Sequence, residues 1–150
     1  MSIWFEGSID IECNIQQVKD SLENHGEHYV GVTSFMPGLM SVKLVEQGSD
    51  FVIIRTNEGL MNRTSISKRV EAESVVVEFD EEYQARPKIT VKSHFSDEIT
   101  VSDAGVKYRT VISGVVALGF LGFFYRKFGK SKTGNAILRS YKTYFEKQNT

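Results

Sequence analysis

The sequence predicts an α+β fold in which an antiparallel sheet packs against one long C-terminal helix. Two observations carry this prediction. Six strand-like segments separated by short turn-forming stretches occupy residues 39–118, and an apolar stripe at helical spacing occupies residues 135–148. Short connections make successive strands antiparallel neighbours. With 150 residues, of which 41% are hydrophobic, the chain is long enough to form one domain, 1–150, with a sizeable core.

The N-terminal part predicts a strand and then a short helix. Odd-numbered residues in 3–11 are apolar or glycine and even-numbered ones are mostly polar, which is the period of a half-buried strand. Asn14 can cap a following helix, with Gln17 in capping-box register, and we expect that helix to end near residues 24–26. Residues 26–38 predict an irregular segment that closes at a Met-Pro-Gly turn.

Six further strands are expected, at residues 39–46, 51–56, 60–70, 75–83, 88–102 and 106–118. The last two have the clearest faces. The residues that share the inward parity are Ile89, Val91, Phe95, Ile99 and Val101 in one strand and Val106, Tyr108, Thr110, Ile112, Val116 and Leu118 in the next. One dry face and one wet face are typical of an antiparallel sheet. A single bulge would reverse the faces beyond it.

The C-terminal segment predicts a helix that begins at Gly134 or Asn135. Its apolar residues fall three or four positions apart, with basic residues on the other side. These apolar residues are Ile137, Leu138, Tyr141, Tyr144 and Phe145. Burying each of them contributes about 1.5–3 kcal/mol. The sheet is the only surface large enough to bury such a stripe, so we expect the helix to pack on it.

The net charge of −1 conceals a strong asymmetry. Residues 1–103 hold 18 acidic and 9 basic side chains, whereas residues 104–150 hold 1 acidic and 9 basic ones. We favour an intramolecular explanation, in which the basic segment lies across an acidic sheet. The alternative is a basic face for anionic lipid or an acidic partner. Nucleic acid is not expected, because the basic residues are not interleaved with aromatic ones over a long stretch.

The order strand, helix, irregular segment, six strands and long helix resembles the helix-grip fold of the START-like (SRPBCC) superfamily. Bet v 1-like proteins, polyketide cyclases and coenzyme Q-binding proteins are members. The resemblance rests on the first strand at 5–11, Met36-Pro37-Gly38, the strand pair at 89–118 and the final helix. It implies a curved seven-stranded antiparallel sheet wrapped around the C-terminal helix, with a small apolar molecule bound in a cavity between them.

The resemblance also implies which residues surround a ligand, namely those on the inward faces of the strands and helix. The candidates are Phe79, Tyr83, Val91, Ser93, Phe95, Asp97, Tyr108, Thr110, Ile112, Ile137 and Tyr141. Aromatic residues of this kind are more often plain core than ligand contacts. A buried Asp97 would have to pair or become neutral. We favour the alternative, in which a bulge near residues 96–98 or a solvated strand end turns Asp97 outward.

No motif in the sequence indicates catalysis or a cofactor. A Ser-His-Asp order, a phosphate loop and a dinucleotide fingerprint are all missing. His25, His28 and Cys13 are metal-ligating types, but they follow a helix end rather than share a helix face, so no metal site is expected. We expect a binding or carrier protein rather than an enzyme. A cyclase-like enzyme with Asp97 or a cavity tyrosine as acid or base is the alternative.

Residues 120–132 combine four phenylalanines with four basic residues. We favour a lid over the cavity, because large exposed apolar patches are uncommon on monomers. A docking surface for a membrane or a protein is the alternative, which leaves open a peripheral membrane contact or a homodimer. The uncharged run 111–125 is shorter than the roughly 20 residues of a membrane span. The lone Cys13 and the lack of an apolar leader favour a cytoplasmic location.

Overall fold

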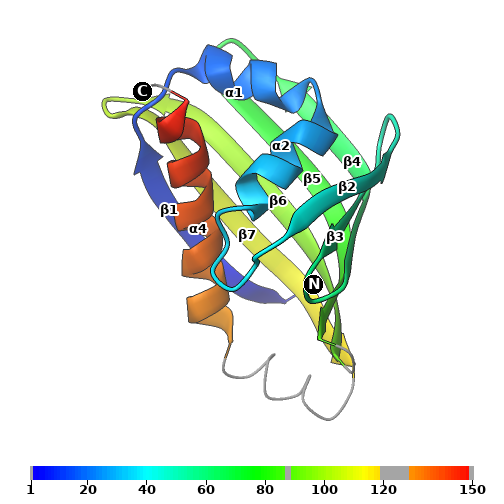
Figure 1. The fold of residues 1–150 in the computed structure, drawn as a ribbon. Coiled ribbons are helices and arrows are strands. Elements are labelled where there is room, and N and C mark those ends of the chain that lie inside the picture. Colours follow the sequence, from blue (N-terminus) through cyan, green and yellow to red (C-terminus); the bar gives the residue numbers. More distant parts are fainter. Residues whose placement is uncertain (1, 87–88, 119–128, 149–150) are drawn as a thin grey trace.

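Seven strands form one antiparallel sheet, and helices α1, α2 and α4 lie on the same side of it (Figure 1). The structure is a computed structural model that describes residues 2–86, 89–118 and 129–148. The strands are β1 (Ile3–Ile11), β2 (Val42–Gln47), β3 (Val52–Thr56), β4 (Leu60–Val70), β5 (Ser74–Arg86), β6 (Ile89–Ser102) and β7 (Gly105–Leu118). The helices are α1 (Ile15–Leu22), α2 (His25–Thr33) and α4 (Lys130–Lys147).

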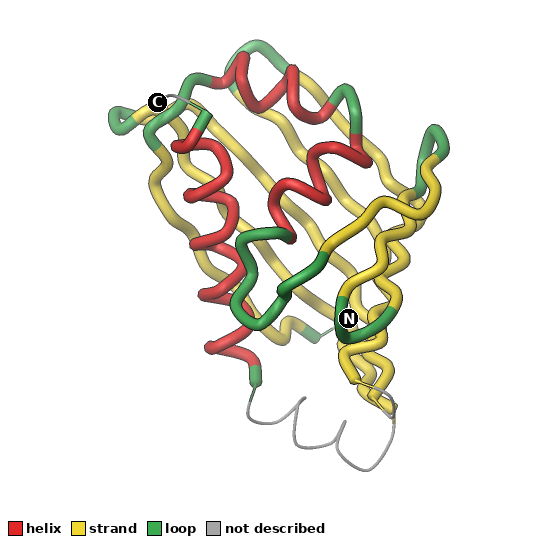
Figure 2. The backbone as a smooth tube through the Cα atoms, in the orientation of Figure 1, coloured by secondary structure: helices red, strands yellow, loops and turns green. Residues whose placement is uncertain are grey.

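The strand order is β1-β7-β6-β5-β4-β3-β2, and every neighbouring pair is antiparallel. Strands β2 to β7 follow one another as a meander, and β1 pairs with the last strand. The sheet curves behind the helices (Figure 2). Helix α4 packs on β1 and β7, whereas α2 packs on β2 and β3. The predicted α+β architecture, with a curved sheet against the C-terminal helix, is confirmed.

The prediction of an irregular segment over residues 26–38 is wrong in its first part, where α2 forms. Asn24 caps α2 by accepting a hydrogen bond from the backbone N–H of Glu27 at 3.0 Å. Two glycines and three β-branched residues lower the helix propensity of this stretch. One of them, Gly31, is required by the packing, because a Cβ there would lie 2.3 Å from the ring of Tyr144. The contact with α4 therefore requires glycine at position 31, although glycine is a poor helix former.

A bulge in β7 reverses which alternate residues of the strand point inward. Gly114 has a φ of 61°, and β7 holds one residue more than β6 at this point. Beyond the bulge Val115 is buried and Val116 is 50% exposed, so the predicted inward orientation of Val116 is wrong. Val101, at the end of β6, is also largely exposed. The side chain of Leu118 lies outside the described part of the chain.

Helix α4 begins at Lys130, several residues before the predicted start at 134 or 135. Its predicted apolar stripe is confirmed in that Ile137, Leu138, Tyr141 and Phe145 are buried. Tyr141 stacks on Tyr108 of β7, with ring centroids 4.1 Å apart. The helix therefore anchors one side of the core directly on the sheet.

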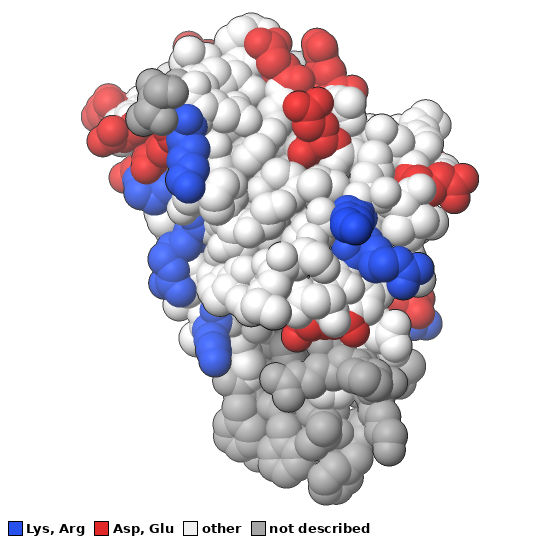
Figure 3. All heavy atoms as spheres, viewed as in Figure 1, with Lys and Arg blue, Asp and Glu red and all other residues white. Residues whose placement is uncertain are grey.

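The basic residues of α4 do not lie across the acidic residues of the sheet. Exposed acidic side chains of β5, such as Glu78 and Asp80, alternate with buried ones and therefore lie on the outer face, away from α4. An ion pair between Arg109 and Glu6 does join the basic and acidic parts of the sequence. Figure 3 shows basic side chains along α4 and acidic ones near α1 and α2. Among the described residues, the Arg109–Glu6 pair at the β1–β7 edge fits the favoured explanation of the charge asymmetry.

Candidate functional site

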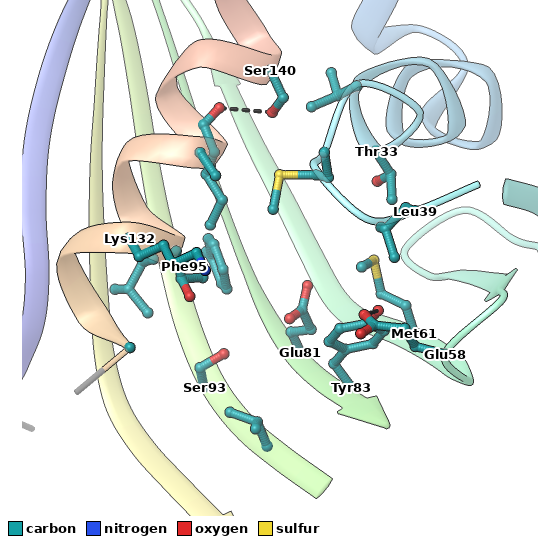
Figure 4. A pocket seen from close by; sticks show the side chains of 18 of the residues that line it. Thr33, Leu39, Glu58, Met61, Glu81, Tyr83, Ser93, Phe95, Lys132 and Ser140 are labelled. Atoms are coloured by element: carbon teal, nitrogen blue, oxygen red, sulfur yellow. Dashed lines mark hydrogen bonds between the residues drawn. The ribbon is translucent and has the colours of Figure 1, made fainter. Parts of the chain in front are cut away.

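A cavity of about 410 Å³ lies between the sheet, the end of α2 and the first half of α4 (Figure 4). Pockets that hold small ligands commonly measure about 300–1,000 Å³. The apolar lining consists of Trp4, Val32, Met36, Pro37, Leu39, Met61, Tyr83, Ile89, Val91, Phe95, Ile112, Val115, Ala136 and Ile137. The polar lining consists of Thr33, Glu58, Arg63, Glu81, Ser93, Lys132, Thr133, Arg139 and Ser140, with Gly129 at the helix start.

The periodicity of each element places these side chains on the cavity wall. Val91, Ser93 and Phe95 alternate along β6, so all three point to the inner face. Ile137 and Ser140 are one helical turn apart on α4, and the Ser140 hydroxyl donates to the Ile137 carbonyl at 2.8 Å. Figure 4 shows Ser93 and Glu81 projecting from the strands toward the side on which α4 lies.

A buried ion pair forms part of the wall. Arg63 of β4 and Glu81 of β5 are register partners, and Arg63 Nε donates to Glu81 Oε2 at 2.9 Å. Their side chains are only 8% and 9% exposed. Burial alone would lower the pKa of Arg63, but the Glu81 carboxylate and nearby tyrosines raise it above its usual value. Arg63 therefore stays charged, and Glu81 is its counter-ion.

The guanidinium of Arg63 lies among three aromatic rings. Its Cζ is 4.6 Å from the ring centres of both Tyr29 and Phe79 and 5.6 Å from that of Phe95. Cation–π contacts of this kind stabilise a desolvated cation but use none of its N–H groups. The bond to Glu81 is the one hydrogen bond that Arg63 makes to a described residue, and Nη1 is buried without a partner. A guanidinium carries five N–H donors, so most of this one is unused.

A second polar group lies at another part of the wall. The hydroxyl of Tyr83 donates to Glu58 Oε1 at 2.5 Å and lies 3.3 Å from Thr56 Oγ1. Burial and the hydrogen bond to Glu58 raise the pKa of Tyr83 above its usual value. Tyr83 is therefore protonated near neutral pH and holds the Glu58 carboxylate in place.

The predicted ligand-binding residues divide into two groups. Six of them line the cavity, namely Tyr83, Val91, Ser93, Phe95, Ile112 and Ile137. Phe79, Asp97, Tyr108, Thr110 and Tyr141 are outside the lining and lie in the packed part of the interior. All eleven share the inner side of the sheet and helix, but the cavity occupies only part of that space.

Asp97 is buried, so the favoured expectation that it turns outward is wrong. It is 3% exposed, and the β6–β7 pairing is regular through Asp97 and its partner Thr110. The hydroxyls of Tyr108 and Tyr141 donate to Asp97 Oδ1 and Oδ2 at 3.1 and 3.2 Å. Burial raises the pKa of Asp97, although these hydroxyls, Arg63 and the adjacent Thr110 oppose the shift. Thr110 Oγ1 makes no hydrogen bond of normal geometry.

The histidines are used structurally. His25 Nε2 lies within hydrogen-bond distance of the backbone oxygens of Gly48 and Ser49, and His28 is buried beside Ser21. Burial lowers the pKa of His28 to about 3, with Arg63 adding to the effect. Within residues 2–86, 89–118 and 129–148, no three His, Cys, Asp or Glu side chains are grouped to hold a metal ion.

Several residues of the wall were not predicted from the sequence. Met36 and Leu39 come from the loop after α2, a helix that was not predicted. Arg63 lies in a strand whose two faces are weakly distinguished in sequence. Glu81 had a detectable signal, because it shares the parity of Phe79 and Tyr83 on β5. An acidic residue between two inward aromatic ones indicates a buried carboxylate that needs a partner.

The expected lid or docking segment at 120–132 falls mostly outside the described residues. Its last residues, 130–132, form the first turn of α4, and Lys132 lines the cavity. The choice between lid and docking surface stays a prediction. None of the helices in the described part of the chain combines the length and apolar character needed to cross a membrane.

Comparison with solved structures identifies the fold. A conserved protein from Geobacillus kaustophilus superimposes with a TM-score of 0.65 at 11% identity, covering 95% of this chain and 94% of that one. A STAR-related lipid transfer protein from Xanthomonas axonopodis gives a TM-score of 0.58 at 11% identity, over 93% and 84% of the two chains. The chain has the START-like helix-grip fold. The predicted resemblance is thereby confirmed at the level of fold.

The same fold also occurs within a larger, two-domain protein. The di-domain ARO/CYC protein BexL, from the BE-7585A biosynthetic pathway, gives a TM-score of 0.52 at 15% identity. The match covers 95% of this chain but 49% of BexL, so this chain corresponds to about half of that protein. No protein-family model matches the chain, and no curated protein matches it in sequence.

Proposed function

We propose that this protein binds or carries a small, mainly apolar molecule in the cavity between its sheet and α4. The observation that carries the proposal is the cavity itself, which has a volume of about 410 Å³ and a mostly apolar wall. Water in such a space gains few hydrogen bonds, so displacing it with apolar surface is favourable. The STAR-related lipid transfer protein with the same fold supports a ligand of this type.

A few fixed polar groups in an apolar wall are typical of ligand pockets, where they orient the bound molecule. Arg63 with Glu81 and Tyr83 with Glu58 form two such groups on the cavity wall. The single cysteine, Cys13, is buried as a free thiol, in keeping with the proposed cytoplasmic location.

The alternative of a cyclase-like enzyme needs Asp97 or a cavity tyrosine as its acid or base, and neither is placed to act in that way. Asp97 lies outside the cavity lining, and both its oxygens accept hydrogen bonds from tyrosines. The tyrosine that does line the cavity, Tyr83, has a raised pKa and donates its proton to Glu58 in a hydrogen bond. A phenol with a raised pKa is a poor general base near neutral pH. We therefore place binding ahead of catalysis.

The test is a titration with diphenylhexatriene, a hydrocarbon dye that fluoresces in apolar surroundings. We expect saturable binding to the native protein and a loss of at least tenfold in affinity for Ala136→Leu, because Ala136 is buried and lines the cavity. Three added carbons would occupy space that the dye needs.

The matched control is Asn135→Leu, which introduces the same side chain at the exposed neighbouring position of α4. Its affinity should stay within threefold of the native value. Absence of saturable dye binding by the native protein, or equal losses in both variants, would overturn the proposal.

A further inference from the structure

A second hollow, here called the outer groove, lies on the face of the sheet that points away from the helices. Its volume is about 590 Å³, and strands β3 to β7 all contribute to it. Five of its residues form one row across the sheet, because each is the register partner of the next. In order from β3 to β7 they are Ile53, Asn62, Glu82, Lys92 and Val116. The row faces outward because it alternates with the inward-facing residues of the same strands.

The three residues in the middle of this row have polar groups that the protein itself does not use. Asn62 Oδ1 is buried and has no hydrogen-bond partner among the described residues. Glu82 and Lys92 are exposed and face each other in the register, yet neither side chain pairs with another in the described part of the chain. A buried acceptor without a donor costs stability. An acceptor, a negative charge and a positive charge are therefore available side by side.

The other charged residues that line the outer groove are already paired. His94 lies between two carboxylates, with Nδ1 2.9 Å from Asp80 Oδ1 and Nε2 3.2 Å from Glu78 Oε1. Glu81 is the counter-ion of Arg63. Among the described charged residues of the groove, the unused ones thus lie in the middle of the first row.

The spacing and signs of the unused groups restrict the ligand. Neighbouring strands are about 4.8 Å apart, so groups that bind to adjacent strands must lie close together in the ligand. A simple amine would meet the like charge of Lys92, and a simple carboxylate would meet that of Glu82. A molecule with an ammonium and a carboxylate on one carbon satisfies both. The ends of the groove are apolar, with Phe51 and Ile53 at one end and Val116 at the other.

From these observations we propose that the outer groove binds a small zwitterion with an apolar side chain, which is the chemistry of a free apolar amino acid. Its ammonium donates to Asn62 Oδ1 and Glu82, and its carboxylate accepts from Lys92. Its side chain packs on an apolar end of the groove. This site lies on the opposite face of the sheet from the central cavity, so the inference is independent of the proposed function.

The test compares three ligands by isothermal titration calorimetry. L-phenylalanine carries both charges, 2-phenylethylamine lacks the carboxylate and 3-phenylpropionate lacks the ammonium. Exposed ion pairs contribute up to about fivefold in affinity, and pairing a buried acceptor contributes about tenfold. The native protein should therefore bind phenylalanine saturably and about three- to fivefold or more tighter than either comparison ligand.

Variants of the middle of the row assign each contact. Asn62→Leu removes the buried acceptor, so it should lower the affinity for phenylalanine about tenfold without destabilising the fold. Lys92→Met should abolish the preference for phenylalanine over 2-phenylethylamine. Glu82→Gln should reduce the preference over 3-phenylpropionate about threefold or more.

Two matched controls change the net charge in the same way at exposed positions of the outer face that do not line the groove. They are Lys107→Met on β7 and Glu98→Gln on β6. Both ligand preferences should stay unchanged in these controls. Equal changes in the groove variants and in the controls would overturn the proposal.

The remaining outcomes separate this inference from the proposed function. Absence of saturable binding of both phenylalanine and leucine up to about 10 mM would overturn the groove site alone. Displacement of bound diphenylhexatriene by phenylalanine would place the amino acid in the central cavity and would also overturn it. Failure of the dye to bind would overturn the proposed function, whereas the titrations without dye would still test the groove.

Discussion

Lowering the pH from 7 to 4.5 should cost the folded protein about 2.5 kcal/mol through His28 alone. His28 is 1% exposed, and its Nδ1 lies 2.8 Å from Ser21 Oγ. Burial, aided by the positive charges of Arg63 and Lys68, lowers its pKa from 6.5 to about 3. The unfolded chain therefore takes up a proton below pH 6.5, whereas the folded protein does not do so until about pH 3.

The direction in which stability changes with pH follows from this difference in proton uptake. The unfolded state binds more protons throughout this interval, so the free energy of unfolding decreases as the pH falls, by about 1.4 kcal/mol per unit below pH 6.5. The magnitude at pH 4.5 does not depend on the exact folded pKa, provided that it lies well below 4.5. Losses of this size are a large fraction of the 5–15 kcal/mol typical of a small domain.

The assay is urea unfolding of the native protein and of His28→Phe at a series of pH values. Phenylalanine keeps a ring among Tyr141, Tyr144 and Phe145, whose centroids lie 5.7–5.8 Å from that of His28. His94, whose pKa is raised by its hydrogen bond to Asp80, has the opposite pH dependence, but it is present in both proteins and cancels.

As the pH falls from 7 to 4.5, the free energy of unfolding of His28→Phe should therefore rise by about 2.5 kcal/mol relative to that of the native protein. A stability difference that stays constant over this range would refute the reasoning. It would mean that His28 is protonated in the folded state.

Three further predictions concern stability at neutral pH, each measured by urea unfolding. Glu81→Gln alone should cost about 3–5 kcal/mol, because it leaves Arg63 buried and unpaired, and R63M/E81Q should cost less than this single change. Gly31→Ala should cost about 1–3 kcal/mol despite the better helix propensity of alanine, because the new Cβ meets Tyr144 at 2.3 Å. Asn14→Ala should cost about 1 kcal/mol, because Asn14 caps α1 through a complete capping box. A stabilised Gly31→Ala variant, or a neutral Glu81→Gln variant, would contradict the packing described for these sites.

The elements with strong local signals were predicted well. Alternation along β5, β6 and β7 and the stripe on α4 follow directly from the burial of one face, and burial depends on periodicity more than on long-range detail. The capping box of Asn14 and Gln17 is a local hydrogen-bond pattern, and it forms as expected. Helix α2 was missed because its two glycines and three β-branched residues give it a low local helix propensity. Its packing against α4 and β2, which stabilises it, is a tertiary effect that local propensity does not register.

The candidate site was predicted less completely than the fold. Parity along a strand indicates which side chains face inward, and it places Asp97 inward. The bulge expected near residues 96–98 does not form. Parity cannot tell which inward side chains meet each other and which leave a space. The Arg63–Glu81 pair depends on the register between β4 and β5, which is set by the whole sheet and its irregularity after Thr64.

The division of the interior explains how one helix can serve stability and binding at once. The second half of α4 holds Tyr141 and Phe145, which are 4% and 0% exposed and pack in the aromatic core without reaching the cavity. In the first half of α4, Ala136 and Ile137 form part of the cavity wall. A core packed at one end fixes the position of the helix, so the other end can remain separated from the sheet without collapsing onto it.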